Sequence, residues 1–223
     1  MGSKLSENII SLLSKRFPKI DSCLDTLREC SVDDHDNCKK EKTENICNVK
    51  EYLSNSKAIV LDFDKVKEEY TRSYNCSCKC LCSVDALFEY DDCFYWIEFK
   101  NGKINSNETK GIKRKASDSI LIFSDISGMK IRDIWSKSVF ILVFNYDKNR
   151  KRVNDELRND NNANEDVSGD SVSLDIIRDH VFGQSKNQFV HFGLGILTGI
   201  HFRQVHTYNK SDFDIFYKSN GIE

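Results

Sequence analysis

Hydrophobic and polar positions predict a β-hairpin in the middle of the chain. Residues 84–90 and 93–100 are rich in aromatic and β-branched side chains, which is typical of paired strands. The polar pair Asp91-Asp92 between them is suited to a tight turn. Farther along, residues 139–146 form a continuous apolar run, which indicates a strand buried on both faces at the centre of a sheet.

Helical spacing of apolar residues predicts helices on either side of this hairpin. Residues 108–124 carry Ile112, Ala116 and Ile120 on one stripe, and their first turns are strongly basic. The other segments with helical spacing are about 4–17, 20–30, 44–55, 62–72, 171–182 and 210–219. A further strand is expected at 199–208. The order helix, hairpin, helix, strand predicts an α/β (α+β) fold with a mixed β-sheet flanked by helices and extra N-terminal helices.

Composition separates the chain into four expected regions. Residues 147–170 are Asn-rich and nearly devoid of apolar side chains, which predicts a flexible polar loop. The regions are an N-terminal helical region at 1–57, a core at 58–146, the polar loop at 147–170 and a C-terminal α/β extension at 171–223 that packs on the core.

The overall charge and hydropathy exclude some classes of protein. The net charge of −2 over 223 residues argues against a uniformly basic nucleic-acid binder, although it allows a local basic face. No run of 18 apolar residues is present, so we expect no transmembrane helix. The N-terminus also lacks the pattern of a secretory signal, so we expect a cytoplasmic protein whose nine cysteines are reduced.

The predicted hairpin brings two acids together. A turn centred on Asp91-Asp92 places Asp85 directly opposite Glu98, with Cβ atoms roughly 5 Å apart. Side chains alternate along a strand, so Lys100 lies on the same face as Glu98. Like charges opposite each other are destabilising, and a divalent cation between the two acids would remove the conflict. Carboxylate oxygens are the ligands that Mg²⁺ prefers.

This pattern, Asp85 followed by Glu98-x-Lys100, resembles the signature of the PD-(D/E)XK nuclease superfamily. The segment Ile-Glu-Phe-Lys-Asn-Gly around the glutamate, the basic helix after it and the later Asp-Ser-Ile-Leu-Ile-Phe also resemble a group of small bacterial proteins with that core. The likeness covers roughly residues 62–146 and, more loosely, the end of the chain. It departs at Val84, where the signature has proline.

The resemblance implies a restriction-endonuclease-like core that hydrolyses phosphodiester bonds, with DNA favoured over RNA as the partner. It implies that Asp85, Glu98 and the Phe99 carbonyl bind Mg²⁺ or Mn²⁺. Such a metal lowers the pKa of a bound water and neutralises charge on the phosphate. Lys100 would orient that water or stabilise the charge that develops on phosphorus.

The resemblance also implies a further acid from the helix before the hairpin and a phosphate contact from the helix after it. Glu69 is the candidate acid because it lies on the apolar face of the predicted helix, and Glu68 is the second choice. Lys113 or Arg114, at the basic start of the later helix, would hold a phosphate oxygen.

Two other functions stay open. One is a catalytically inactive relative that uses the same core as a binding or interaction module. The other is zinc or redox chemistry at Cys76, Cys78, Cys80 and Cys82, whose alternation puts four thiols on one face of an extended strand. Four ligands along a straight strand span about 20 Å and cannot converge on one ion, so small buried side chains are the favoured interpretation.

Overall fold

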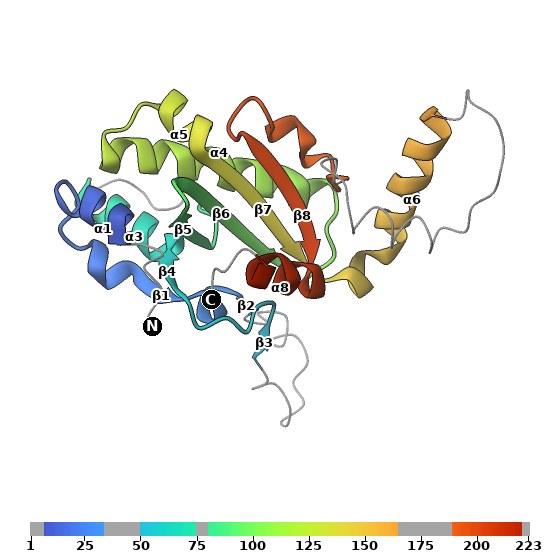
Figure 1. Ribbon diagram of the computed structural model, residues 1–223, viewed down its shortest axis with the longest axis horizontal. Helices are drawn as coiled ribbons and strands as arrows, with labels where there is room; N and C mark the ends of the chain where they lie inside the picture. The colour runs from blue at the N-terminus through green and yellow to red at the C-terminus, as the bar shows by residue number, and fades with distance from the viewer. Residues whose placement is uncertain (1–6, 34–49, 75–79, 165–188, 220–223) are drawn as a thin grey trace.

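A six-stranded mixed β-sheet with helices on both faces organises the computed structural model (Figure 1). The structure describes residues 7–33, 50–74, 80–164 and 189–219. The strands in their order across the sheet are β1 (Leu24–Thr26), β4 (Ile59–Asp62), β5 (Ala86–Tyr90), β6 (Cys93–Lys100), β7 (Ser138–Phe144) and β8 (Gln204–Asn209). Neighbours from β1 to β6 are antiparallel, whereas β6, β7 and β8 run parallel. The expectation of a mixed sheet flanked by helices is therefore confirmed.

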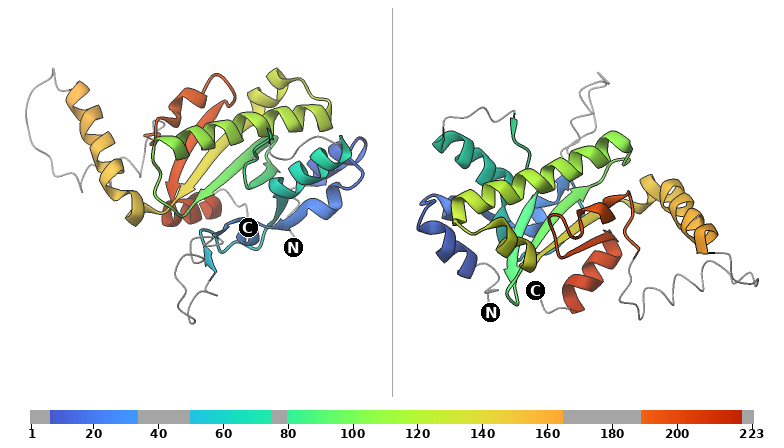
Figure 2. Two further views of the ribbon diagram at one scale, coloured as in Figure 1. Left: turned by 180° about the vertical axis from the view of Figure 1, so that it is seen from behind. Right: turned by 90° about the horizontal axis from the view of Figure 1, so that it is seen from above.

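Alternating side chains divide the core into two layers. One face of the sheet, which includes Trp96 and Phe140, packs against most of the helices. These are α1 (Glu7–Ser14), the 3₁₀ turn η1 (Ile20–Cys23), α3 (Phe63–Ser73), α4 (Ser106–Ser127), α5 (Ile131–Lys137) and the 3₁₀ turn η4 (Leu194–Leu197). The other face, which includes Phe88 and Ile141, packs against α2 (Leu27–Cys30) and α8 (Lys210–Ser219). Figure 2 shows α4 crossing over the first face when the sheet is seen from above.

The hairpin forms in the predicted register. Tyr90 lies opposite Cys93, and the ladder runs back to Ala86 opposite Ile97. Asp91 and Asp92 have φ angles of 50° and 58°, the left-handed conformation that both central residues of a type I′ turn require. The turn residues therefore fix which side chains of β5 and β6 face each other.

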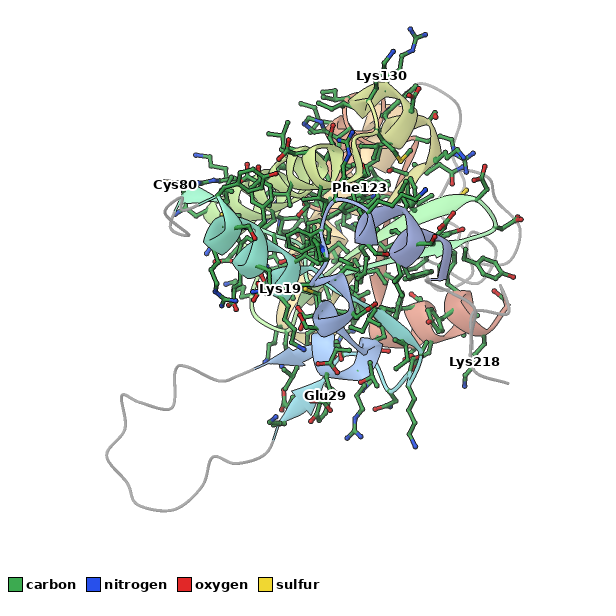
Figure 3. The ribbon with its side chains drawn as sticks, turned by 90° about the vertical axis from the view of Figure 1, so that its left-hand side faces the viewer. Lys19, Glu29, Cys80, Phe123, Lys130 and Lys218 are labelled. Atoms are coloured by element: carbon green, nitrogen blue, oxygen red, sulfur yellow. The ribbon has the colours of Figure 1, made fainter. Side chains whose placement is uncertain are left out.

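The predicted central strand and the helix above it are also confirmed. All seven residues of β7 are buried, as expected for a strand with helices on both faces. The Asn105 side chain caps the start of α4, where it accepts hydrogen bonds from the backbone N–H groups of Asn107 and Glu108. Gly128, whose φ is 71°, caps the end of the helix. Its apolar stripe includes Phe123, which Figure 3 shows among packed side chains beneath the helix.

Two predictions near the N-terminus are wrong. The segment predicted as a helix at 20–30 is divided into η1, the edge strand β1 and the single turn α2. Pairing of Leu24 with Leu61 in the sheet outweighs the local helical spacing. Within the predicted helix at 44–55, residues 51–52 instead form β3 (Glu51–Tyr52), which pairs with β2 (Val32–Asp33). Residues 44–49 lie outside the described residues.

The prediction of a polar loop at 147–170 is wrong for residues 147–164, and residues 165–170 lie outside the described residues. Helix α6 (Tyr146–Asn164) occupies this part of the chain and extends away from the sheet in Figure 1. Val153 and Asn149 are buried at its base, and Leu157 packs against the core from the next turn. Three inward positions four residues apart are enough to anchor a helix that is otherwise polar.

The C-terminal predictions agree in part with the structure. Helix α8 has the predicted bounds, whereas the strand expected at 199–208 begins only at β8. The helix predicted at 171–182 lies outside the described residues. Within the described ranges, no helix combines the length and the apolar character needed to cross a bilayer.

Candidate active site

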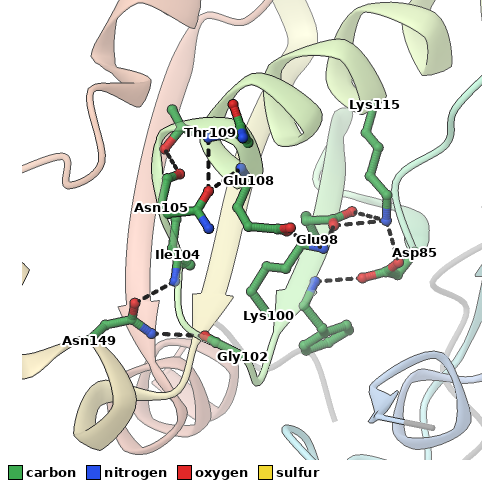
Figure 4. Close-up of polar contacts among 12 residues, drawn as sticks. Asp85, Glu98, Lys100, Gly102, Ile104, Asn105, Glu108, Thr109, Lys115 and Asn149 are labelled. Atoms are coloured by element: carbon green, nitrogen blue, oxygen red, sulfur yellow. Dashed lines mark hydrogen bonds and ion pairs between the residues drawn. The ribbon is translucent and has the colours of Figure 1, made fainter. Parts of the chain in front are cut away.

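Two carboxylates and one ammonium group converge beneath α4 (Figure 4). The Lys115 Nζ atom lies 2.8 and 3.0 Å from the two carboxylate oxygens of Glu98 and 3.2 Å from Oδ1 of Asp85. Asp85 precedes β5, Glu98 is in β6 and Lys115 is in the third turn of α4. The predicted meeting of Asp85 and Glu98 is therefore present, and a lysine from a third element lies between them.

The local fold explains why Glu98 points to α4. Side chains alternate along β6, so Trp96, Glu98 and Lys100 share the face that α4 covers. The Glu98 side chain is 0% exposed as a result. Asp85 lies just beyond the paired part of β5, and its Oδ2 accepts the Phe99 N–H at 2.6 Å. This hydrogen bond orients the other Asp85 oxygen toward Lys115.

Lys100 is a second ammonium group beside Glu98. Its ammonium group is 3.6 Å from Glu98 Oε1 and 3.3 Å from Glu108 Oε2. Glu108 comes from the first turn of α4, which the Asn105 cap fixes. The Lys100 side chain is 27% exposed, so solvent reaches the site from this side.

Burial and the paired acids shift the ionisation of the whole cluster. Burial, followed by the charge of Asp85, raises the pKa of Glu98 to about 8, although Lys115 and Lys100 act in the opposite direction. Burial also raises the pKa of Asp85 despite the charge of Lys115. Burial alone would lower the pKa of Lys115, but Asp85 and Glu98 raise it well above its usual range. Lys115 is therefore charged at neutral pH.

The donor atoms fit a hard divalent cation only in part. Asp85 Oδ1 and Glu98 Oε1 both point at one cationic atom, Lys115 Nζ, so their lone pairs converge on a common position. Mg²⁺ binds such oxygen pairs and completes its shell with water and substrate oxygens. However, among the described residues no three His, Cys, Asp or Glu side chains are grouped so as to hold a metal ion. The protein supplies two carboxylates, and an ammonium group lies between them.

The acid predicted from the preceding helix lies elsewhere. The Glu69 carboxylate pairs with Lys19 at 3.1 Å and with Arg72. The pKa of the Cys23 thiol is raised mainly by burial, and the charge of Glu68 adds to that rise. The acid of α3 that acts on the site is Asp64, whose charge contributes to the raised pKa of Asp85. Asp64 is in the first turn of α3, where it accepts a hydrogen bond from Ser83 and pairs with Lys67.

One of the two residues predicted to bind phosphate, Arg114, is paired with groups other than the two carboxylates. Arg114 donates to the Cys80 carbonyl and pairs with Asp118 at 3.5 Å. Lys113 is half-buried on the same helix. The residue that reaches the site is Lys115, to which the sequence analysis assigned no role. Lys115 lies three residues after Ile112 and Lys113 three residues before Ala116, so both flank the inward stripe and spacing alone does not choose between them.

The cysteine cluster is only partly described. Cys80 is exposed and Cys82 is half-buried, and both are free thiols. The interpretation as small buried side chains is therefore wrong at Cys80, and neither residue lies in a strand. Cys76 and Cys78 lie outside the described residues.

Comparison with protein-family models, with curated protein sequences and with solved structures gives no match.

Proposed function

We propose that this protein is a metal-dependent nuclease of the PD-(D/E)XK type, with a restriction-endonuclease-like core and Mg²⁺ or Mn²⁺ as cofactor. The observation that supports this proposal is the convergence of Asp85 Oδ1 and Glu98 Oε1 on one cationic position, with Lys100 on the same face. Such a pair of buried acids costs stability, and perturbed acids concentrate at functional sites.

The residues would divide the work as follows. Asp85 and Glu98 would hold a divalent ion, with the Phe99 carbonyl as a further candidate ligand. A bound ion would supply Lewis acidity toward the phosphate and the attacking water. Lys100, partly exposed beside Glu98, stabilises negative charge that develops on the phosphate and orients the water. The Glu69 carboxylate, which pairs with Lys19 and Arg72, takes no part in this arrangement.

The proposed substrate is nucleic acid, with DNA favoured over RNA, in the cytoplasm. The exposed Lys103, just before α4, and the exposed Lys110, near its start, supply positive charge at this end of the helix. Lys113 adds to the charge of this helix. Such residues contact phosphates without reading sequence, so we expect weak sequence preference and a strong dependence on salt.

Cleavage assays on the full chain test the proposal. The wild type should cleave DNA when Mg²⁺ or Mn²⁺ is added, and Asp85→Ala, Glu98→Ala and Lys100→Ala should each lower the rate by about 10²–10³-fold or more. Glu69→Gln is the matched control, because its carboxylate pairs outside the cluster, and it should cleave like the wild type. Circular dichroism checks that each variant is folded. Undiminished cleavage by Asp85→Ala would reject the assignment.

A catalytically inactive binding module is the second candidate, and the charge balance favours it. Lys115 lies within 3.2 Å of Asp85 and Glu98, and Lys100 lies 3.6 Å from Glu98, so the acids already have cationic partners from the protein. Acids paired in this way do not need a metal to offset their charge. If the wild type binds DNA in a filter assay but cleaves neither DNA nor RNA with any added metal, this second function is supported.

A further inference from the structure

The Lys115 side chain occupies the position on which the two acids converge. Its Nζ atom lies within 3.2 Å of three carboxylate oxygens, two from Glu98 and one from Asp85. These are the oxygens that the proposed function assigns to a divalent ion. A metal bound to both acids would lie next to the positive charge of Lys115, which is unfavourable beside the fully buried Glu98.

The charges already present argue against simple addition of a metal. Lys115 and Lys100 both lie within 3.6 Å of Glu98, so a dication added beside them would be a third cationic group next to a fully buried side chain. If Lys115 withdraws, the dication is left with both acids and with Lys100, and one cationic group fewer lies beside Glu98. Exchange therefore costs less than addition.

The Lys115 side chain can move away from the two carboxylates. A lysine carries a compact charge on a flexible four-carbon stem. The Lys115 side chain is 25% exposed, so part of it already lies at the surface. By contrast, Glu98 is fixed under the helix and Asp85 is held by the Phe99 N–H. The cation is therefore the part of the cluster that can move.

We propose that Lys115 is the resident cation of this site and competes with a divalent metal for the position between Asp85 and Glu98. The inference rests on the metal site of the proposed function and adds a property to it. When no metal is bound, the ammonium group is the cationic partner of both acids. Metal enters only in the fraction of molecules in which Lys115 has withdrawn, so the apparent affinity of the wild type is reduced by that fraction.

Calorimetric titration of the full chain with Mn²⁺ alone, and with Mg²⁺ alone, tests the competition. Lys115→Met should bind Mn²⁺ at least about tenfold more tightly than the wild type, because the competitor is gone. Lys130→Met is the control, since Lys130 is exposed and lies outside the cluster, and its affinity should equal that of the wild type. Addition of Glu98→Gln to Lys115→Met should reverse the gain. An Mn²⁺ affinity of Lys115→Met equal to or weaker than that of the wild type overturns the proposal.

Two further measurements keep the test decisive if Lys115→Met is unstable. Mn²⁺ should raise the melting temperature of Lys115→Met more than that of the wild type, because the ion takes over the neutralising role. Lys115→Arg keeps the charge and should gain no affinity, so a tenfold gain in that variant contradicts competition.

The nuclease proposal fails separately. Tighter Mn²⁺ binding by Lys115→Met without any cleavage by the wild type supports the exchange and rejects the activity. Metal-dependent cleavage with no gain in affinity rejects the exchange alone.

Discussion

Glu98 beneath α4 and Glu156 on α6 both lie among positively charged or hydrogen-bonding partners, yet their pKa values shift in opposite directions. Burial and the charge of Asp85 raise the pKa of Glu98 to about 8. Burial also acts on Glu156, but its hydrogen bonds with His191, Phe192 and Arg152 lower its pKa. Both carboxylates have partners, but only Glu98 also has a second acid, Asp85, beside it.

Glu156 has donors on both oxygens and a structural role. Arg152 contacts Oε1 at 3.0 Å, while the Phe192 N–H and His191 contact Oε2 at 2.8 and 3.3 Å. These contacts tie α6 to the segment before β8. Glu98 instead faces a second acid across the hairpin. The comparison indicates that Glu156 stabilises the fold, whereas Glu98 is retained at a cost in stability, as is common at functional sites.

The largest expected effect is the loss of Glu156. Glu156→Ala should lower the free energy of unfolding by about 2–3 kcal/mol, because the buried Phe192 N–H and the Arg152 side chain lose a charged acceptor. Urea denaturation followed by circular dichroism measures the change. A loss below about 0.5 kcal/mol, the level typical of surface substitutions, would show that Glu156 does not join α6 to the core.

Removal of the charge on Glu98 should have a smaller effect of the opposite sign. Glu98→Gln keeps the shape of the side chain and leaves Lys115 paired with Asp85, so the like-charge conflict disappears. We expect a gain of about 1–2 kcal/mol in the free energy of unfolding without metal. The matched control is Glu156→Gln, which should lose stability under the same conditions. If Glu98→Gln loses as much as Glu156→Gln, the two acids have the same role and the comparison fails.

The centre of the fold could be predicted from the sequence because local signals agree there. The Asp91-Asp92 turn fixes the hairpin register, and the apolar run of β7 requires cover on both faces. These two features together place Asp85 across from Glu98, and alternation adds Lys100. The part of the site made by β5 and β6 therefore follows from spacing alone.

The contributions of other elements could not be predicted in the same way. The rotation of α4 over the sheet decides that Lys115, and not Lys113 or Arg114, reaches the acids. One residue along a helix is a turn of about 100°, and the basic run gave no means of choosing among neighbours. The position of Glu69 could not be predicted for a similar reason, because its partner Lys19 comes from a segment fifty residues earlier. Tertiary pairing of this kind leaves no periodic trace in the sequence.

The smallest expected effect is a difference in acid sensitivity. The lowered pKa of Glu156, which faces Arg152 and His191, means that it stabilises the folded state above its unfolded pKa. As the pH falls below that value, the unfolded chain binds the proton first, and the contribution is lost as the pH passes through the folded pKa. The stability difference between the wild type and Glu156→Gln should therefore narrow toward low pH, by less than about 1 kcal/mol for a partly exposed pair.

Urea denaturation from pH 7 to pH 3 measures this narrowing, and Glu98→Gln is the comparison that sharpens it. Glu98→Gln keeps Glu156 and all three of its partners. The difference in free energy of unfolding between Glu98→Gln and Glu156→Gln should therefore narrow over the same acid range. A gap between the wild type and Glu156→Gln that stays constant down to pH 3 would mean that the carboxylate contributes through packing alone. Only the raised pKa of Glu98, and not the lowered pKa of Glu156, would then distinguish the two acids.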